Sequence, residues 1–152
     1  MKIVDLSYLK KHFREIGGAY TVRDIVEEAR SEFFQKILAN VKILPVEIKY
    51  IEEVIKKANE VGVLDYLSRA DIKLCALAYK YRDKATLFTN DLYIQNLCYF
   101  LGIKFDGDQK IKYAKKFRYE CPKCKLVSES PICPKCGSIA DRKVIKVFKI
   151  KY

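Results

Sequence analysis

Four of the six cysteines form two Cys-x-x-Cys pairs, a spacing that is typical of metal ligands. The first pair is Cys121 and Cys124, and the second pair, Cys133 and Cys136, follows after eight residues. Two such pairs can surround one zinc ion with four thiolates in a tetrahedron, which leaves no position open for water. A redox dithiol or a pair of disulfides is the alternative. The duplication of the pair favours a structural zinc site.

The residues around these pairs fit the same interpretation. Gly137 directly follows the second pair, where the backbone often needs a positive φ to turn back toward sulfur, and Lys125 occupies the equivalent position after the first. A module of about 30 residues buries too little surface to fold alone, so a bound metal would supply much of its folding free energy. Cys75 and Cys98 lie on apolar helix faces and are expected in the core.

Four acidic residues are spaced so that an α/β fold could bring them together. Asp5 and Asp91 each follow a short apolar strand, Asp71 lies in the first turn of a helix, and Glu28 lies in another helical segment. In a parallel sheet the strand ends and the adjoining helix ends share one edge. Carboxylates gathered there raise each other's pKa unless a cation neutralises them. Mg²⁺ or Mn²⁺ suits such oxygen ligands and could activate water for phosphodiester hydrolysis.

Each of these acids also has an ordinary structural explanation. Asp71 could cap its helix, and Asp91 could begin one. Glu28, beside Glu27, could lie on a solvated helix face, and Asp5 could end a strand at the surface. Position alone therefore leaves both explanations open for every one of them.

The apolar pattern predicts short strands that alternate with amphipathic helices. We expect strands at 2–4, 41–44 (buried), 85–88, 103–105 and 143–152, and helices at 20–30 (with Thr21 as N-cap), 47–61, 68–79 and 91–101. This alternation predicts an α/β fold with a parallel sheet. A change of composition at 105–108 predicts a first domain at 1–108, a basic connector at 109–118 and the cysteine module at 119–152.

The excess positive charge is concentrated near the C-terminus. Residues 110–152 contain 13 of the 30 basic side chains but only 3 of the 19 acidic ones. Such a segment indicates a polyanionic partner, with nucleic acid first and an anionic membrane second, although a solvated basic tail remains the simpler explanation.

Basic and aromatic side chains alternate through the connector, as expected for a surface that follows phosphates and stacks on unpaired bases. The candidate RNA-binding residues are Lys110, Lys112, Tyr113, Lys115, Lys116, Arg118, Lys123 and Lys135. Alternatively, Phe117 and Tyr119 could pack between the domains. His12, the single histidine, is expected to be an ordinary surface residue. The early acid Asp5 and the lack of a long apolar run predict a cytoplasmic chain without signal peptide or membrane span.

Three segments together resemble the PIN domain, a family of metal-dependent ribonucleases: Tyr20–Glu28, Leu67–Ile72 and Asp91–Asn96. A PIN domain followed by a four-cysteine ribbon is similar to the Nob-type endonucleases of small-subunit ribosome maturation, in an archaeal short form. The resemblance implies a three-layer αβα sandwich with a parallel central sheet, followed by a small zinc ribbon. It also implies a Mg²⁺ or Mn²⁺ site and cleavage of single-stranded precursor rRNA at the 3′ end of small-subunit rRNA, on the nascent ribosomal subunit.

The acids of the family carry over to Asp5, Glu28, Asp71 and Asp91, while Ser7, Ser68 and Thr89 match hydroxyls that commonly assist them. Two alternatives remain. A toxin-type PIN ribonuclease would need a small antitoxin partner, and a zinc ribbon is unexpected there. A non-catalytic ribosome-binding or assembly factor is compatible with Leu6, because PIN domains usually place a small or hydroxyl residue directly after the first Asp.

Overall fold

A five-stranded parallel sheet forms the centre of the computed structural model, which describes residues 1–152. The strands are β1 (Lys2–Val4), β2 (Tyr20–Thr21), β3 (Lys42–Ile43), β4 (Thr86–Phe88) and β5 (Lys104–Asp106), in the order β3-β2-β1-β4-β5. The chain first adds strands on one side of β1 and then on the other. The neighbouring strands β1 and β4 therefore form the switch point of the sheet, where α/β folds place their sites.

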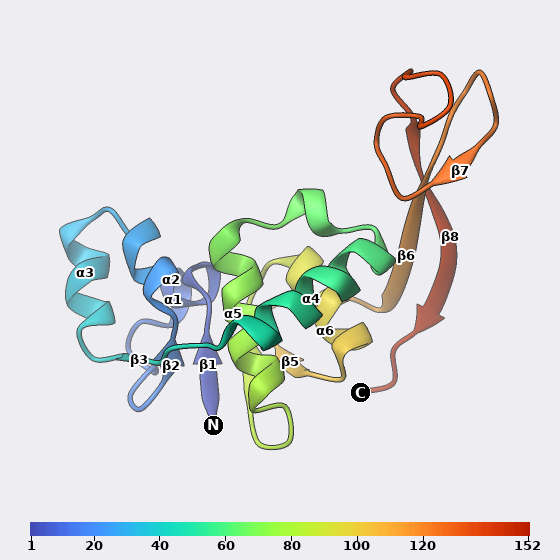
Figure 1. Ribbon diagram of the computed structural model, residues 1–152. Helices are drawn as coiled ribbons and strands as arrows, with labels where there is room; N and C mark the ends of the chain where they lie inside the picture. The colour runs from blue at the N-terminus through green and yellow to red at the C-terminus, as the bar shows by residue number, and fades with distance from the viewer.

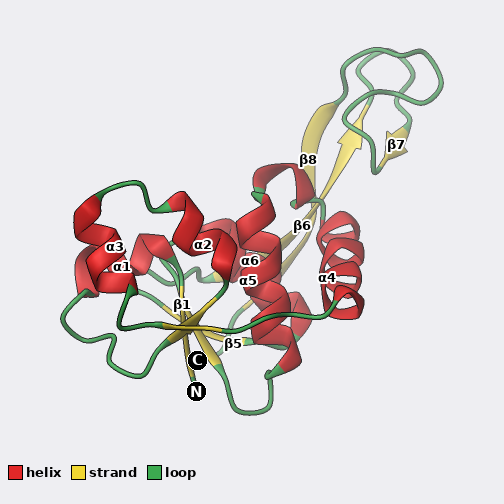
Figure 2. Cartoon of the chain, turned by 60° about the vertical axis from the view of Figure 1, so that its left-hand side comes forward, coloured by secondary structure: helices red, strands yellow, loops and turns green.

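Helices cover both faces of the sheet (Figures 1 and 2). They are α1 (Leu6–His12), α2 (Arg23–Glu28), α3 (Glu32–Leu38), α4 (Ile48–Val61), α5 (Arg69–Lys80) and α6 (Leu92–Leu101), with a 3-10 turn, η1, at Leu64–Tyr66. Successive side chains of a strand point to opposite faces. Ile3 accordingly lies in the larger core with α2, α4, α5 and α6, whereas Val4 lies in a smaller core with α1 and α3. The expected three-layer αβα sandwich is confirmed.

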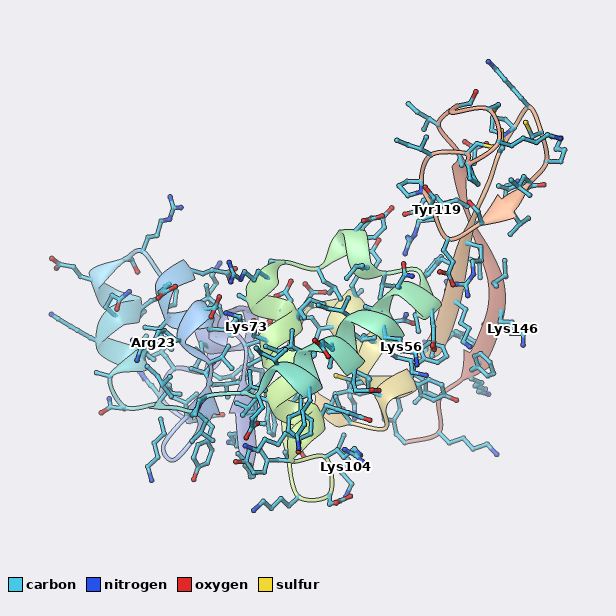
Figure 3. The ribbon with its side chains drawn as sticks, viewed as in Figure 1. Arg23, Lys56, Lys73, Lys104, Tyr119 and Lys146 are labelled. Atoms are coloured by element: carbon cyan, nitrogen blue, oxygen red, sulfur yellow. The ribbon has the colours of Figure 1, made fainter.

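The C-terminal strands form a second, antiparallel sheet, in which β6 (Tyr113–Glu120) pairs with both β7 (Val127–Ser128) and β8 (Asp141–Lys149). We call these strands and the two Cys-x-x-Cys turns the ribbon. Figure 1 shows the ribbon projecting from the α4 and α6 side of the molecule, at the far end from α3. In Figure 3, Tyr119 lies at the base of the projecting part, and Lys146 lies on the outer strand β8.

Side chains and backbone join the ribbon tightly to the first domain. Gly62 ends α4 with φ 82°, and a Cβ at this position would overlap the backbone of Phe117 in β6. Arg142 from β8 lies 3.6 Å from the ring centroid of Phe117 and donates to the carbonyl oxygen of Gly62 over 3.3 Å. The hydroxyl of Tyr119 donates to Asp65 over 3.1 Å. Phe117 and Tyr119 therefore pack between the domains, as the second interpretation of these aromatics proposed.

Most of the expected helices are confirmed to within two residues. Ser68 and Asp71 form the reciprocal hydrogen bonds of a capping box at the start of α5, and Gly102 ends α6 with φ 70°. Apolar residues at a spacing of three and four, namely Val54, Ala58 and Val61, turn one face of α4 toward the core. Cys75 and Cys98 are fully buried, as expected.

Two expectations about the elements were wrong. Tyr20–Arg30 is not one helix, because Tyr20–Thr21 forms β2 and α2 begins only at Arg23, with Val22 and not Thr21 as its N-cap. The hydroxyl of Thr21 donates to the carbonyl oxygen of Val4 within the sheet instead. The strand expected to be buried at 41–44 is the exposed edge strand β3. Residues 113–118 of the expected basic connector form part of strand β6 and pair with β8.

Candidate active site and metal centre

Asp5 directly follows β1, and its side chain is buried at the edge where the strands end. The hydroxyls of Ser7 and Thr89 donate to Asp5 Oδ2 over 2.7 and 2.8 Å. The backbone N–H of Leu6 donates to Oδ1 over 2.8 Å, so Asp5 is also the N-cap of α1. Burial raises the pKa of Asp5 and the charge of Asp91 adds to this, while the hydrogen bonds lower it. Three donors thus hold a desolvated carboxyl group at the switch point.

Asp91 lies on the neighbouring strand end, between β4 and α6. Its backbone N–H donates to Thr89 Oγ1 over 3.0 Å, so one hydroxyl contacts both acidic residues. Asp91 Oδ1 accepts from the backbone N–H groups of Tyr93 and Ile94, at 2.8 and 3.2 Å, which caps α6. The other oxygen, Oδ2, accepts no hydrogen bond from the protein. This arrangement fixes the carboxylate and leaves one oxygen free for a ligand.

Asp71 and Glu28 meet at the hydroxyl of Ser68. In the capping box, Asp71 Oδ2 accepts from the backbone N–H of Ser68 over 2.8 Å. The hydroxyl of Ser68 donates to Glu28 Oε1 over 3.3 Å. Lys73 of α5 also bonds Asp24 of α2 over 3.0 Å, which fixes the two helices side by side. The last residue of α2 and the first turn of α5 are thereby brought together.

Electrostatics connects Asp71 with the strand ends. Its pKa is raised from 3.8 to about 6, first by burial and then by the charges of Asp5 and Asp91, against the hydrogen bond from Ser68. Asp71 therefore lies close enough to Asp5 and Asp91 for their charges to act on it. Such a group of acids carries negative charge that a cation would neutralise.

The acidic cluster, which we define as Asp5, Glu28, Asp71 and Asp91, is open and not a closed cage. The four cysteines are the only set of three or more ligand atoms that all lie within 4.8 Å of one another. Mg²⁺ commonly keeps several waters and binds through one or two carboxylates, so an open set of oxygen donors fits this ion. A donor set of oxygens alone also suits Mn²⁺ and disfavours soft metals.

Sequence reasoning missed a polar network beside Asp5. The backbone N–H of Asn90 donates to the hydroxyl of Ser7 over 3.0 Å, and the Asn90 side chain donates to Asp108 over 2.8 Å. Asp108 also lies 2.6 Å from His12 Nε2, so His12 is not the isolated surface residue that we expected. Asp108 comes two residues after β5, and the rule that strand ends share an edge could have identified it.

The sulfur atoms of Cys121, Cys124, Cys133 and Cys136 converge at the tip of the ribbon, all within 4.8 Å of one another. Four sulfurs at about 2.3 Å from a central zinc would lie about 3.8 Å apart. The Cys121 and Cys136 sulfurs are 3.6 Å apart. The residues present therefore fit a four-sulfur metal site.

Both Cys-x-x-Cys turns have the same backbone form. The N–H of Lys125 donates to the carbonyl oxygen of Cys121, and that of Gly137 donates to Cys133, each over 2.9 Å. Gly137 has φ 74° and Lys125 has φ 58°, the only positive value outside glycine. Lys125 thus adopts the conformation expected at its position although it has a Cβ. The hydrogen bond from Lys125 to Cys121 holds this residue in a left-handed backbone conformation, which costs a residue with a Cβ some strain.

The candidate RNA-binding side chains divide into two groups. Those that are exposed are Lys110, Lys112, Tyr113, Lys115, Lys123 and Lys135. Lys116 and Arg118 are half-buried instead. Arg118 lies 3.6 Å from Glu129 and bonds the carbonyl oxygen of Glu60, and Lys116 lies over the ring of Phe100. These two contact the protein itself, and so does Lys110, which lies 3.8 Å from Asp106 and over the ring of Tyr152. The other five exposed side chains are left to face a ligand.

Comparison with known proteins places the molecule in a class. The family described as "PIN domain of ribonuclease" matches residues 3–81. Strands β2 and β3, the acidic cluster up to Asp71 and the whole of α5 lie in this range. The chain is thus a PIN-domain ribonuclease.

Individual relatives cover more of the chain than the family model does. The chain is 35% identical over 130 residues to endoribonuclease Nob1 of Archaeoglobus fulgidus, covering 82% of this chain and 77% of that protein. It is 33% identical over 165 residues to endoribonuclease Nob1 of Methanocaldococcus jannaschii, covering 96% of this chain and 79% of that protein. Ribonuclease VapC1 of Thermoplasma acidophilum is 30% identical over 110 residues, but only 56% of its length is covered. The chain belongs to the Nob1 family of endoribonucleases.

Proposed function

We propose that this endoribonuclease cleaves single-stranded precursor rRNA and so matures the 3′ end of small-subunit rRNA on the nascent ribosomal subunit. The observation that carries the chemistry is the meeting of Asp5 and Asp91 at the hydroxyl of Thr89, beside Asp71, whose pKa burial and these two charges raise to about 6. The family membership supports the choice of RNA as substrate.

The acidic cluster would hold Mg²⁺ or Mn²⁺. A bound ion of this kind lowers the pKa of water and stabilises the charge that develops on a phosphodiester. The chain's own residues do the positioning: Ser7 and Thr89 hold the Asp5 carboxylate, and the N-terminal turn of α6 holds that of Asp91. Asp91 Oδ2 and the exposed Glu28 are left to face the ligand.

The ribbon would bind zinc through its four cysteines and RNA through its lysines. Four sulfur ligands leave no open coordination position, so this metal is structural. We assign the nuclease to residues 1–108 and RNA positioning to the connector, 109–118, and the cysteine module, 119–152. The contacts of Gly62 and Arg142 support this division of labour, because they hold the ribbon in one orientation to the acidic cluster.

Two alternatives are weaker. A toxin-type ribonuclease would not need the ribbon, and the VapC1 relative is covered over little more than half its length. A non-catalytic binding factor was compatible with Leu6. The Leu6 side chain, however, packs against the cores, and only its backbone N–H contacts Asp5. The serine at the next position supplies the hydroxyl.

The test incubates the protein with RNA that spans the end of small-subunit rRNA. We expect cleavage near that end with Mn²⁺. We expect none after dialysis into buffer that contains zinc but neither Mg²⁺ nor Mn²⁺. Dialysis replaces a strong chelator here, because a chelator would also remove the metal of the ribbon. Asp91→Asn should abolish cleavage. Asp83→Asn should not, because Asp83 is an exposed acid in the turn before β4, at the opposite edge of the sheet. Equal cleavage of tRNA and unrelated RNA would point to a toxin, and binding without cleavage to an assembly factor.

A further inference from the structure

A pocket of about 180 Å³ lies between α6 and β6, beside the acidic cluster. Its walls include Leu92, Tyr93 and Asn96 from α6 and Tyr113, Lys115 and Phe117 from β6. Leu92 directly follows Asp91, and consecutive Cα atoms are 3.8 Å apart. The pocket therefore begins within one residue of the acidic cluster.

The deeper walls of the pocket are fixed by contacts of their own. The amide of Asn96 donates to the carbonyl oxygen of Lys115 over 3.0 Å and accepts from its N–H over 2.7 Å, which joins α6 to β6. Tyr93 stacks on Tyr66 with ring centroids 4.7 Å apart. Arg142 covers Phe117. A ligand would thus meet preformed walls and pay little for ordering them.

The outer walls, in contrast, have no partner. Leu92 and Tyr113 are 47% and 48% exposed. Lys115 is exposed and forms no salt bridge. An aromatic face, an apolar side chain and a free cation around a small pocket match a base and its phosphate. Because residues 110–152 are strongly basic, RNA fits this surface better than a protein segment does.

We propose that this pocket binds one unpaired base of the substrate RNA, next to the phosphate that is cleaved, with the base against Tyr113 and Leu92 and its phosphate at Lys115. The inference rests on the proposed function for the identity of the RNA. It adds a subsite that positions the strand at the acidic cluster. Alternate residues of a strand share one face, so Tyr113 and Lys115 of β6 both face this base.

The experiment places 2-aminopurine at successive positions of the substrate RNA, and measures fluorescence with the zinc-loaded protein in Ca²⁺ buffer. We expect quenching at one position next to the cleavage site, because a stacked base loses fluorescence. Tyr113→Ala should remove this quenching and Tyr113→Phe should keep it. Leu92→Ala, which leaves the strand untouched, should weaken it. Phe33→Ala removes an equally exposed aromatic from distant α3 and should change nothing.

Cleavage gives the second measurement. An abasic nucleotide at the quenched position should lower kcat/KM about 5- to 100-fold for the wild-type protein, as expected for one base stack. In Tyr113→Ala the same abasic nucleotide should have little further effect. Uniform responses to abasic nucleotides at all positions, with normal cleavage of intact RNA, would overturn the pocket and leave the proposed function standing. Position-specific quenching without any metal-dependent cleavage would overturn the proposed function and leave the base pocket.

Discussion

The hydroxyl of Thr89 donates a hydrogen bond of 2.8 Å to Asp5 Oδ2, although 84 residues separate them in sequence. The hydroxyl oxygen of Thr89 also accepts a hydrogen bond from the backbone N–H of Asp91 over 3.0 Å. Thr89 is fully buried, so it joins the ends of β1 and β4 below the region open to a ligand. The hydroxyl of Thr89 thus links Asp5 and Asp91 of the acidic cluster through hydrogen bonds.

Replacement of Thr89 by valine should therefore disrupt the site without changing side-chain shape. We expect Thr89→Val to lower kcat/KM about 10- to 100-fold, because Asp5 loses a donor and can turn from its position. A buried carboxyl group that loses a hydrogen bond also costs about 1–3 kcal/mol of stability. Single-turnover cleavage at a temperature well below the Tm of the variant separates the two effects. Thr89→Ser should restore cleavage, and an unaltered rate for the valine variant would refute this role.

The free energy of unfolding without divalent ions should depend on Asp71. Its folded pKa of about 6 exceeds the ordinary 3.8, so the folded state holds its proton more tightly, and this contribution is lost as pH rises from about 4 to above 6. The shift corresponds to about 3 kcal/mol, reduced to about 1 kcal/mol because the side chain is partly exposed. Asp71→Asn should raise the Tm at pH 7 in buffer free of Mg²⁺ and Mn²⁺.

Added Mg²⁺ provides the complementary measurement. It should raise the Tm of the wild-type protein, since a ligand that binds only the folded state stabilises it, and should raise that of Asp71→Asn much less. Asp83→Asn should behave like the wild type in both buffers, because Asp83 lies in the turn before β4. Equal Mg²⁺ responses of all three proteins would contradict a role for Asp71 in ion binding.

Local signals in the sequence predicted much of the fold. The Ser68–Asp71 capping box and the glycine at 102 fixed the limits of α5 and α6, because these features act within one helical turn. The rule that parallel strands end at one edge then placed Asp5 and Asp91 together. Both steps need only neighbouring residues and one topological rule.

The elements that were missed depend on distant contacts. Strand β2 has two residues, too few for any periodic pattern, and exists because Tyr20 pairs with Ile3 on β1 and with Lys42 on β3. Residues 110–118 resemble a solvated linker in sequence, yet residues 113–118 belong to β6 because β8 pairs with them. Asp108 and His12 come together through the fold alone.

The orientation of the ribbon should depend on Gly62. Gly62→Ala places a Cβ against the backbone of Phe117 and strains a residue with φ 82°. Gly102→Ala is the matched control, because its φ is 70° and no atom lies within 4 Å of the added Cβ. We expect the control to lose about 1–2 kcal/mol from strain alone and Gly62→Ala to lose clearly more. Urea unfolding measures both. Equal losses of stability in the two variants would show that β6 can move away from the added Cβ at no cost in free energy.

A displaced ribbon should also affect cleavage. If the ribbon positions RNA at the acidic cluster, Gly62→Ala should lower the cleavage of long substrates that reach both domains, and should change that of short oligonucleotides little. Gly102→Ala should have the same effect on the cleavage of long and short substrates. A uniform loss on both substrates in Gly62→Ala would instead indicate damage to the first domain.

Removal of zinc should unfold the tip of the ribbon and leave the first domain folded. The two Cys-x-x-Cys turns have few contacts besides their own hydrogen bonds, whereas α5 and α6 lie in a core of 21 buried residues. Elemental analysis should give one zinc per chain. After chelation, hydrogen exchange should show loss of protection at the amides of Lys125 and Gly137 and retention at Leu74 and Leu97. Removal of zinc should also lower the affinity for RNA, because Lys123 and Lys135 lose their fixed positions on the turns. Protection that persists at both turns without metal would mean that the backbone alone forms them and that this module folds without zinc.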